Sequence, residues 1–165
     1  MLRVRHEDHT SIPKGTMYDG ELLRYAHLLK IPGFRGVKMR DELPNKPHDE
    51  ECGILNLNTH LQKGSHWTCW YKNGGTCYYF DSFAETPPIE LEKYIKSTMQ
   101  VASNAQIIHR NAVTVQHEQS EECGSLCLNV LKMLFNGIEF PEILTSLLER
   151  HETFPTPPLS VTISR

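Results

Sequence analysis

Residues 66–81, HWTCWYKNGGTCYYFD, decide how this chain folds. Two runs rich in aromatic residues lie on either side of Asn73-Gly74-Gly75. Such runs around an Asn-Gly pair are typical of a β-hairpin, because these residues adopt the backbone angles of a tight turn without strain. The stretch therefore predicts two antiparallel strands joined by a very short loop.

The position of the turn sets which residues face each other. If Asn73-Gly74 forms the loop, His66 lies directly opposite Asp81, with Cβ atoms about 4.5–5.5 Å apart on one face of the sheet. A carboxylate at that distance holds an imidazole in one tautomer and stabilises its protonated form. If Gly74-Gly75 forms the loop instead, every pair shifts. On the hairpin alone, an ordinary surface pair of His66 and Asp81 stays open as the alternative.

The other elements are predicted from hydrophobic spacing and from the residues that start and stop helices. We expect a helix with Asp19 as its N-cap, a long polar loop over 34–51 and a buried strand over 52–58. Beyond the hairpin we expect a helix after Pro88, short strands over 106–109 and 112–116, and helices starting near Ser120 and Pro141. This order predicts an α+β domain over 1–154, with a central mixed sheet flanked by helices, and a proline-rich tail over 155–165.

Composition narrows the classes of function. The 165 residues carry 17 basic and 20 acidic side chains, a formal charge of −3, so electrostatics gives no reason to expect nucleic acid as the main partner. No apolar run is long enough to predict a membrane span, and the N-terminal residues do not predict a secretory signal. The 5 cysteines are an odd number, which indicates free thiols in a reducing compartment.

Cys123 stands out among the cysteines. It lies in the first turn of the helix predicted after Ser120, where free N–H groups and the helix dipole favour a thiolate. A nearby imidazolium would lower the pKa of the thiol further, whereas Glu121 and Glu122 oppose this unless their side chains point to water. Cys127, one turn further along the same apolar stripe, is predicted to be a core residue.

Gln116 is the candidate for stabilising negative charge on a substrate. It lies shortly before Cys123, at the end of a predicted strand, where its amide N–H can point at the oxygen that becomes negative when a thiolate attacks a carbonyl. Gln119 competes for this role by position. On the residues alone, a polar surface glutamine remains the simpler reading.

Several blocks of sequence resemble a known family. The segments GSHW (64–67), TCYYFDSF (76–83) and VQHEQSEECGSLC (115–127) are similar to the signature blocks of the adenain family of adenovirus maturation proteases. They are more similar still to adenain relatives in Polinton-type mobile elements, virophages and related DNA viruses. GVKMRDELP (36–44) and ECGILNLN (51–58) resemble the region upstream of the histidine in those relatives. The resemblance covers roughly residues 19–135.

The resemblance implies a role for each matched residue. His66 takes the catalytic histidine position, Asp81 the acid position, Gln116 the oxyanion position and Cys123 the nucleophile position. It also implies a cysteine endopeptidase with the fold of the SUMO-deconjugating proteases. The expected substrates are viral precursor proteins, such as capsid proteins, met inside the host cell or packaged in the virion.

Two further properties of adenain bear on partners. Adenain is activated by a peptide disulfide-linked to a cysteine, and the matching position here is Ala105, so any activating peptide is expected to bind without that disulfide. Adenain also uses DNA through a basic surface, which we do not expect in a chain of charge −3. We expect no cofactor and no metal.

Three alternatives remain at this point. A deubiquitinase or SUMO-like isopeptidase would use the same catalytic residues. A catalytically inactive relative would keep the fold for binding alone. A metal-binding interaction module is the third, although it lacks the close ligand pairs of structural zinc sites; its ligands would be Cys52, His60, His66, Cys69 and Cys77.

Overall fold

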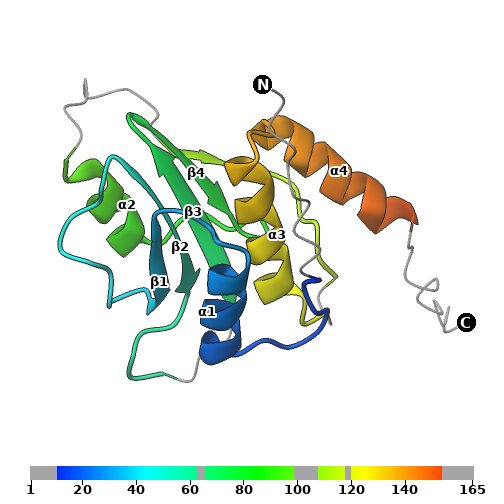
Figure 1. Ribbon diagram of the computed structural model, residues 1–165, viewed down its shortest axis with the longest axis horizontal. Coiled ribbons are helices and arrows are strands. Elements are labelled where there is room, and N and C mark those ends of the chain that lie inside the picture. Colours follow the sequence, from blue (N-terminus) through cyan, green and yellow to red (C-terminus); the bar gives the residue numbers. More distant parts are fainter. Residues whose placement is uncertain (1–10, 63–65, 99–107, 118–119, 154–165) are drawn as a thin grey trace, which may run out of the picture.

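The computed structural model describes residues 11–62, 66–98, 108–117 and 120–153 (Figure 1). In this part of the chain, one mixed sheet has the strand order β1-β2-β3-β4-β5. The strands are β1 (Phe34–Met39), β2 (Glu50–Asn56), β3 (Trp67–Asn73), β4 (Thr76–Phe80) and β5 (Ile108–Arg110). The helices are α1 (Asp19–Leu28), α2 (Ile89–Lys96), α3 (Cys123–Phe135) and α4 (Phe140–Thr153).

The sheet is antiparallel in its centre and parallel at both edges. Strands β2, β3 and β4 pair antiparallel, whereas β1 runs parallel to β2 and β5 runs parallel to β4. This arrangement confirms the expected α+β fold with a central mixed sheet and flanking helices. None of the described helices is long and apolar enough to cross a membrane.

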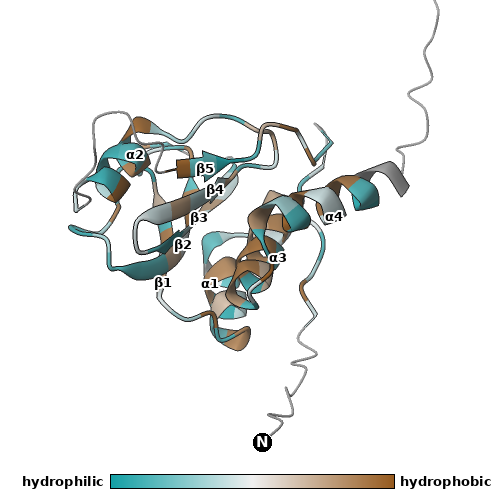
Figure 2. Cartoon of the chain, turned by 90° about the horizontal axis from the view of Figure 1, so that it is seen from above, coloured by the Kyte–Doolittle hydropathy of each residue, from teal (hydrophilic) through white to brown (hydrophobic). Residues whose placement is uncertain are grey.

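Helices cover both faces of the sheet, with α2 on one face and α1, α3 and α4 on the other (Figure 2). Side chains alternate between the faces along each strand. In β3, Cys69 lies in the larger core with α3, and the next residue, Trp70, lies in the smaller core with Leu91 and Ile95 of α2. The alternating side chains of the hairpin therefore contribute to the hydrophobic cores on both faces of the sheet.

The register of the hairpin differs from the one we preferred. Asn73 pairs with Thr76, so the loop is Gly74-Gly75, and Gly74 adopts a positive φ of 58°. A glycine at the first loop position is typical of a type II′ turn. Every predicted pair is therefore wrong by two residues. Because side chains alternate with a period of two, this shift leaves each side chain on the face that we predicted.

Three smaller predictions were also wrong. The segment expected to be a loop contains β1, whose residues are all partly exposed, so no alternation marked it as a strand. Residues 112–116 follow β5 as a loop rather than as a strand. Asp19 lies inside the first turn of α1, whose N-cap is Tyr18. The tail 155–165 and the start of the expected strand 106–109 lie outside the described residues.

Trp70 joins β2 to β3 on the α2 face. Its ring is fully buried and lies directly over Gly53, where a Cβ atom would come within 2.2 Å of Cη2 of Trp70. The indole Nε1 donates a hydrogen bond of 3.0 Å to the buried carboxylate of Glu51, which also accepts from the hydroxyl of Tyr94. These contacts fix α2 and the hairpin to the centre of the sheet.

Candidate active site

Cys123, His66 and Asp81 come together because the start of α3, the start of β3 and the end of β4 lie at the same place in the fold. Cys123 is the first residue of α3, which packs across β3. His66 immediately precedes β3, and Asp81 immediately follows β4. His66 and Cys123, together with Gln116, line a cleft of about 620 Å³. The structure thus brings together the four residues predicted from the sequence.

The imidazole of His66 is held by Asp81 and by Phe83. Its Nε2 atom lies 2.6 Å from Oδ1 of Asp81, whose side chain is fully buried. The His66 ring stacks on Phe83, with centroids 4.7 Å apart and an interplanar angle of 25°. Because Nε2 is taken by Asp81, Nδ1 is the ring nitrogen left for the sulfur of Cys123.

Asp81 reaches His66 even though the two do not face each other directly. In the observed register the residue opposite Asp81 would be Thr68, and His66 is its diagonal neighbour on the same face. Diagonal neighbours lie within reach of long side chains. Oδ1 of Asp81 also accepts a hydrogen bond of 2.8 Å from the N–H of Phe83, which turns the carboxylate toward the imidazole.

The pKa values of the pair shift in opposite directions. Burial lowers the pKa of His66, but the hydrogen bonds to Asp81 and Cys123 outweigh it and raise the pKa to about 9 from 6.5. Burial raises the pKa of Cys123, but the hydrogen bond to His66 and the N–H groups of Trp67 and Gly124 outweigh it, so the pKa lies below 9.0. These shifts favour a thiolate beside an imidazolium, the reactive form of such a pair.

Gln116 is buried at the edge of the same cleft, with 3% of its surface exposed. Its Oε1 accepts a hydrogen bond of 2.5 Å from the hydroxyl of Ser82. Its Nε2 donates a hydrogen bond of 2.5 Å to the carbonyl oxygen of Ser120. An amide nitrogen carries two hydrogens, so one remains to be donated to a group bound in the cleft.

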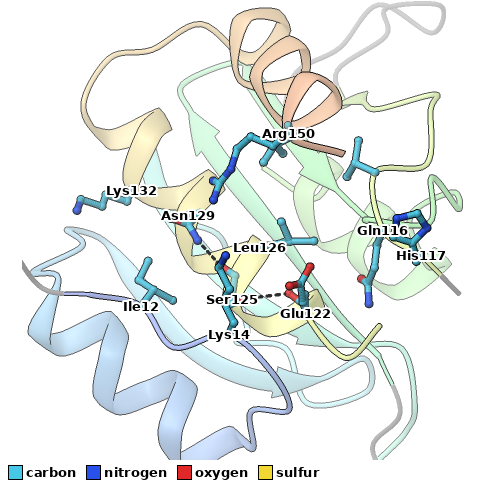
Figure 3. A pocket seen from close by; sticks show the side chains of 12 residues that line it. Ile12, Lys14, Gln116, His117, Glu122, Ser125, Leu126, Asn129, Lys132 and Arg150 are labelled. Carbon is cyan, nitrogen blue, oxygen red and sulfur yellow. Dashed lines mark hydrogen bonds between the residues drawn. The ribbon is translucent and has the colours of Figure 1, made fainter. Parts of the chain in front are cut away.

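Gln116 also borders a second cavity, of about 290 Å³. This cavity lies between α3, α4 and the segment that precedes α1, and Figure 3 shows Gln116 and Glu122 at the same end of it. The carbonyl of Glu122 accepts a hydrogen bond of 3.0 Å from Ser125 in the first turn of α3. Gln116 therefore lies against the start of the helix that carries Cys123.

Asn111 and Ser82 are two residues of the site that the sequence did not indicate. Oδ1 of Asn111 accepts from the N–H of Asp81 at 3.1 Å, and its Nδ2 donates to the carbonyl of Asp81 at 2.6 Å. The N–H of Val115 donates to the carbonyl of Ser82 at 2.8 Å. The loop that carries Gln116 is thereby tied to the strand end that carries Asp81. The position of Ser82 next to the acid was its only signal in the sequence.

The segment before α1 was also missed, and it holds the start of α3 in place. The indole Nε1 of Trp67 donates to the carbonyl of Met17 at 3.0 Å. A Cβ atom on Gly124 would lie 3.0 Å from Cδ2 of Leu22 and 3.2 Å from Cβ of Met17. Gly124 is therefore what lets α1 and this segment approach the helix directly beside Cys123.

The remaining predictions fall into two groups. Cys127 is fully buried and its pKa is raised by that burial, which confirms its place in the core. Gln119 and Ala105 lie outside the described residues. Within the described ranges, the cysteines and histidines of the metal-binding alternative do not gather into a ligand set, and the group that does gather is Asp41, Glu42 and His60, on the surface.

This fold is similar to that of a protease of known structure. The structure superposes on the selenomethionine form of the ASFV pS273R protease with a TM-score of 0.55 and 15% identity, covering 87% of this chain and 67% of that chain. A second structure of that protease gives a TM-score of 0.52 at 16% identity, with the same coverage. The SUMO protease Ulp1 aligns at 14% identity with a TM-score of 0.49, over 84% of this chain and 80% of that chain. No protein-family model matches the sequence, and no curated protein matches it either.

Proposed function

We propose that this chain is a cysteine endopeptidase with Cys123 as nucleophile, His66 as general acid and base, Asp81 as the group that orients His66, and Gln116 as an oxyanion donor. The observation that carries the proposal is the shared cleft. A thiol of lowered pKa, an imidazole of raised pKa and a buried amide donor line one cavity that is open to solvent.

The geometry supports a two-stage mechanism. The thiolate of Cys123 attacks the scissile carbonyl carbon, and the oxygen that becomes negative accepts hydrogen bonds from the free N–H of Gln116 and from a backbone N–H near Cys123. His66 gives its proton to the leaving amine as the peptide C–N bond breaks. Water, deprotonated by His66, then attacks the carbonyl carbon of the thioester. The carbon–sulfur bond breaks, the acid product leaves, and the Cys123 thiolate and the His66 imidazolium are restored.

We further propose that the substrates are precursor proteins of a virus or a mobile element, capsid proteins in particular. Two observations support this class. The blocks around His66, Asp81 and Cys123 resemble the adenain family and its Polinton-type relatives. The structures that share this fold include a protease of a virus, ASFV. Such substrates would be met in the infected cell or inside the assembling particle.

The direct test is incubation of the protein with the capsid precursors encoded beside it, followed by mass spectrometry of the products. Wild-type protein is expected to cut at defined peptide bonds, and Cys123→Ala is expected to cut at none while keeping its fold by circular dichroism. Near-wild-type turnover by Cys123→Ala would refute the assignment. Fluorogenic substrates made from ubiquitin-like C-termini form the second arm, since hydrolysis of these alone would favour the isopeptidase alternative.

A further inference from the structure

We propose that Ser82 is a positioning residue that holds the amide of Gln116 in the one orientation that stabilises an oxyanion. This rests on the proposed function and deepens it. A side-chain amide has two ends of similar shape, and a rotation of 180° exchanges a donor for an acceptor. If Oε1 of Gln116 faced the cleft, it would repel the developing negative charge.

The partners of Gln116 decide which end faces which way. The carbonyl oxygen of Ser120 only accepts hydrogen bonds, so the group beside it at 2.5 Å must be the Nε2 donor. Oε1 is then directed at Ser82, whose hydroxyl donates to it at 2.5 Å. Ser82 and Gln116 are 1% and 3% exposed, so water does not readily replace this donor.

Ser82 itself is held by the backbone of the site. Its carbonyl accepts a hydrogen bond from the N–H of Val115, the residue before Gln116. The residue before Ser82 is Asp81, and the side chain of Asn111 forms hydrogen bonds with both the N–H and the carbonyl of Asp81. The adjacent residues Asp81 and Ser82 therefore position both the carboxylate that orients His66 and the hydroxyl that orients Gln116. The acid and the oxyanion donor are positioned together.

The test compares steady-state kinetics on a peptide that the wild type cleaves. Ser82→Ala leaves the buried Oε1 of Gln116 without a donor, with only the Ser120 carbonyl to hold the amide. The amide is then free to rotate away from the oxyanion, so kcat is expected to fall about tenfold or more and KM to stay within about twofold. Ser82→Thr keeps a hydroxyl and is expected to restore most of the lost rate. Ser146→Ala, which removes a hydroxyl bonded to the carbonyl of Ile143 on the distant α4, is the matched control and is expected to match the wild type.

A double-mutant cycle and an alkylation assay separate positioning from a general structural role. If Ser82 acts through Gln116, Ser82→Ala combined with Gln116→Ala is expected to be no slower than Gln116→Ala alone, within about threefold. Alkylation of Cys123 by iodoacetamide forms no oxyanion, so its rate and pH profile are expected to be unchanged in Ser82→Ala.

Three results would overturn the inference: an unchanged kcat in Ser82→Ala, additive losses in the cycle, or alkylation that falls in parallel with kcat. The proposed function fails in a different way. It fails if the wild type cleaves no peptide, or if Cys123→Ala still does.

Discussion

Nε2 of His66 lies 2.6 Å from Oδ1 of the fully buried Asp81 side chain, while one face of the imidazole stacks on the ring of Phe83. The carboxylate fixes the ring orientation and helps to raise the pKa of His66 to about 9. As a result, His66 stays protonated across neutral pH, and its hydrogen bond to Cys123 contributes to the same rise.

Replacement of this carboxylate should therefore move the pH profile. In Asp81→Asn the contribution of the Asp81 charge to the raised pKa of His66 is lost, whereas burial still lowers that pKa and Cys123 still raises it. In the proposed mechanism His66 must be protonated, so the alkaline limb of the kcat/KM profile is expected to shift from about pH 9 to a lower pH. The measurement is kcat/KM against pH for both proteins. An alkaline limb that stays in place in Asp81→Asn would contradict this role.

Removal of the His66 imidazole should raise the pKa of the Cys123 thiol. The hydrogen bond and charge of His66 lower the pKa of Cys123, and burial raises it. In His66→Ala only burial and the backbone N–H groups remain, so the alkylation midpoint of Cys123 is expected to rise. It is measured by iodoacetamide labelling against pH. His109→Ala, on the far edge strand β5, is the control and is expected to keep the wild-type midpoint.

Ala84 tests whether the backbone turn that follows Asp81 is strained. It has a positive φ of 59°, in a turn closed by the bond from its N–H to the carbonyl of Asp81. A side chain in this conformation costs about 1 kcal/mol relative to glycine. Ala84→Gly is expected to raise the free energy of unfolding, by up to about 1 kcal/mol, in urea titrations.

The control for that variant is Ala112→Gly, in the exposed loop after β5, where φ is not positive. It is expected to lower the free energy of unfolding by about 0.4–1 kcal/mol, because glycine only adds freedom to the unfolded chain. If both variants lose stability equally, the strain assigned to Ala84 is wrong.

Gly53 tests the packing that fixes the hairpin to the sheet. A Cβ atom there would lie 2.2 Å from Cη2 of Trp70, which is fully buried and has no room to retreat. Gly53→Ala is expected to lower the free energy of unfolding by about 3 kcal/mol. Gly75→Ala, where a Cβ atom meets nothing within 4 Å, is expected to change it by less than about 0.5 kcal/mol. Similar losses for the two variants would contradict this packing.

The sequence predicted correctly which side chains of the hairpin share a face, because the alternation of side chains between the faces does not depend on the exact position of the turn. The chosen turn was one residue early, which displaced every pair by two, yet His66 and Asp81 stayed on one face. The helix that carries Cys123 was also predicted, since its apolar stripe has clear helical spacing, but its start was placed near Ser120 and the helix begins at Cys123, with Glu122 as N-cap. For this reason the sequence could predict that Cys123, His66 and Asp81 lie close together, while their roles remain part of the proposal.

What the sequence did not predict depends on long-range contacts of polar atoms. The edge strand β1 has no alternating burial, so its hydrogen bonds to β2 alone define it. Asn111 looks like any loop asparagine until its amide is seen to bond both backbone groups of Asp81. The hydrogen bond between Trp67 and Met17 joins residues that are 50 positions apart in the sequence, which no local pattern marks.

Selective alkylation is the most direct measurement of the central claim that Cys123 is a thiolate held by His66. At pH 6.5, limiting iodoacetamide followed by peptide mapping is expected to label Cys123 first. Burial raises the pKa of the thiols of Cys52, Cys77 and Cys127, whereas the pKa of Cys123 is lowered. If Cys123 reacts only above pH 9, or no faster in the wild type than in His66→Ala, the thiolate and the enzyme built on it are contradicted.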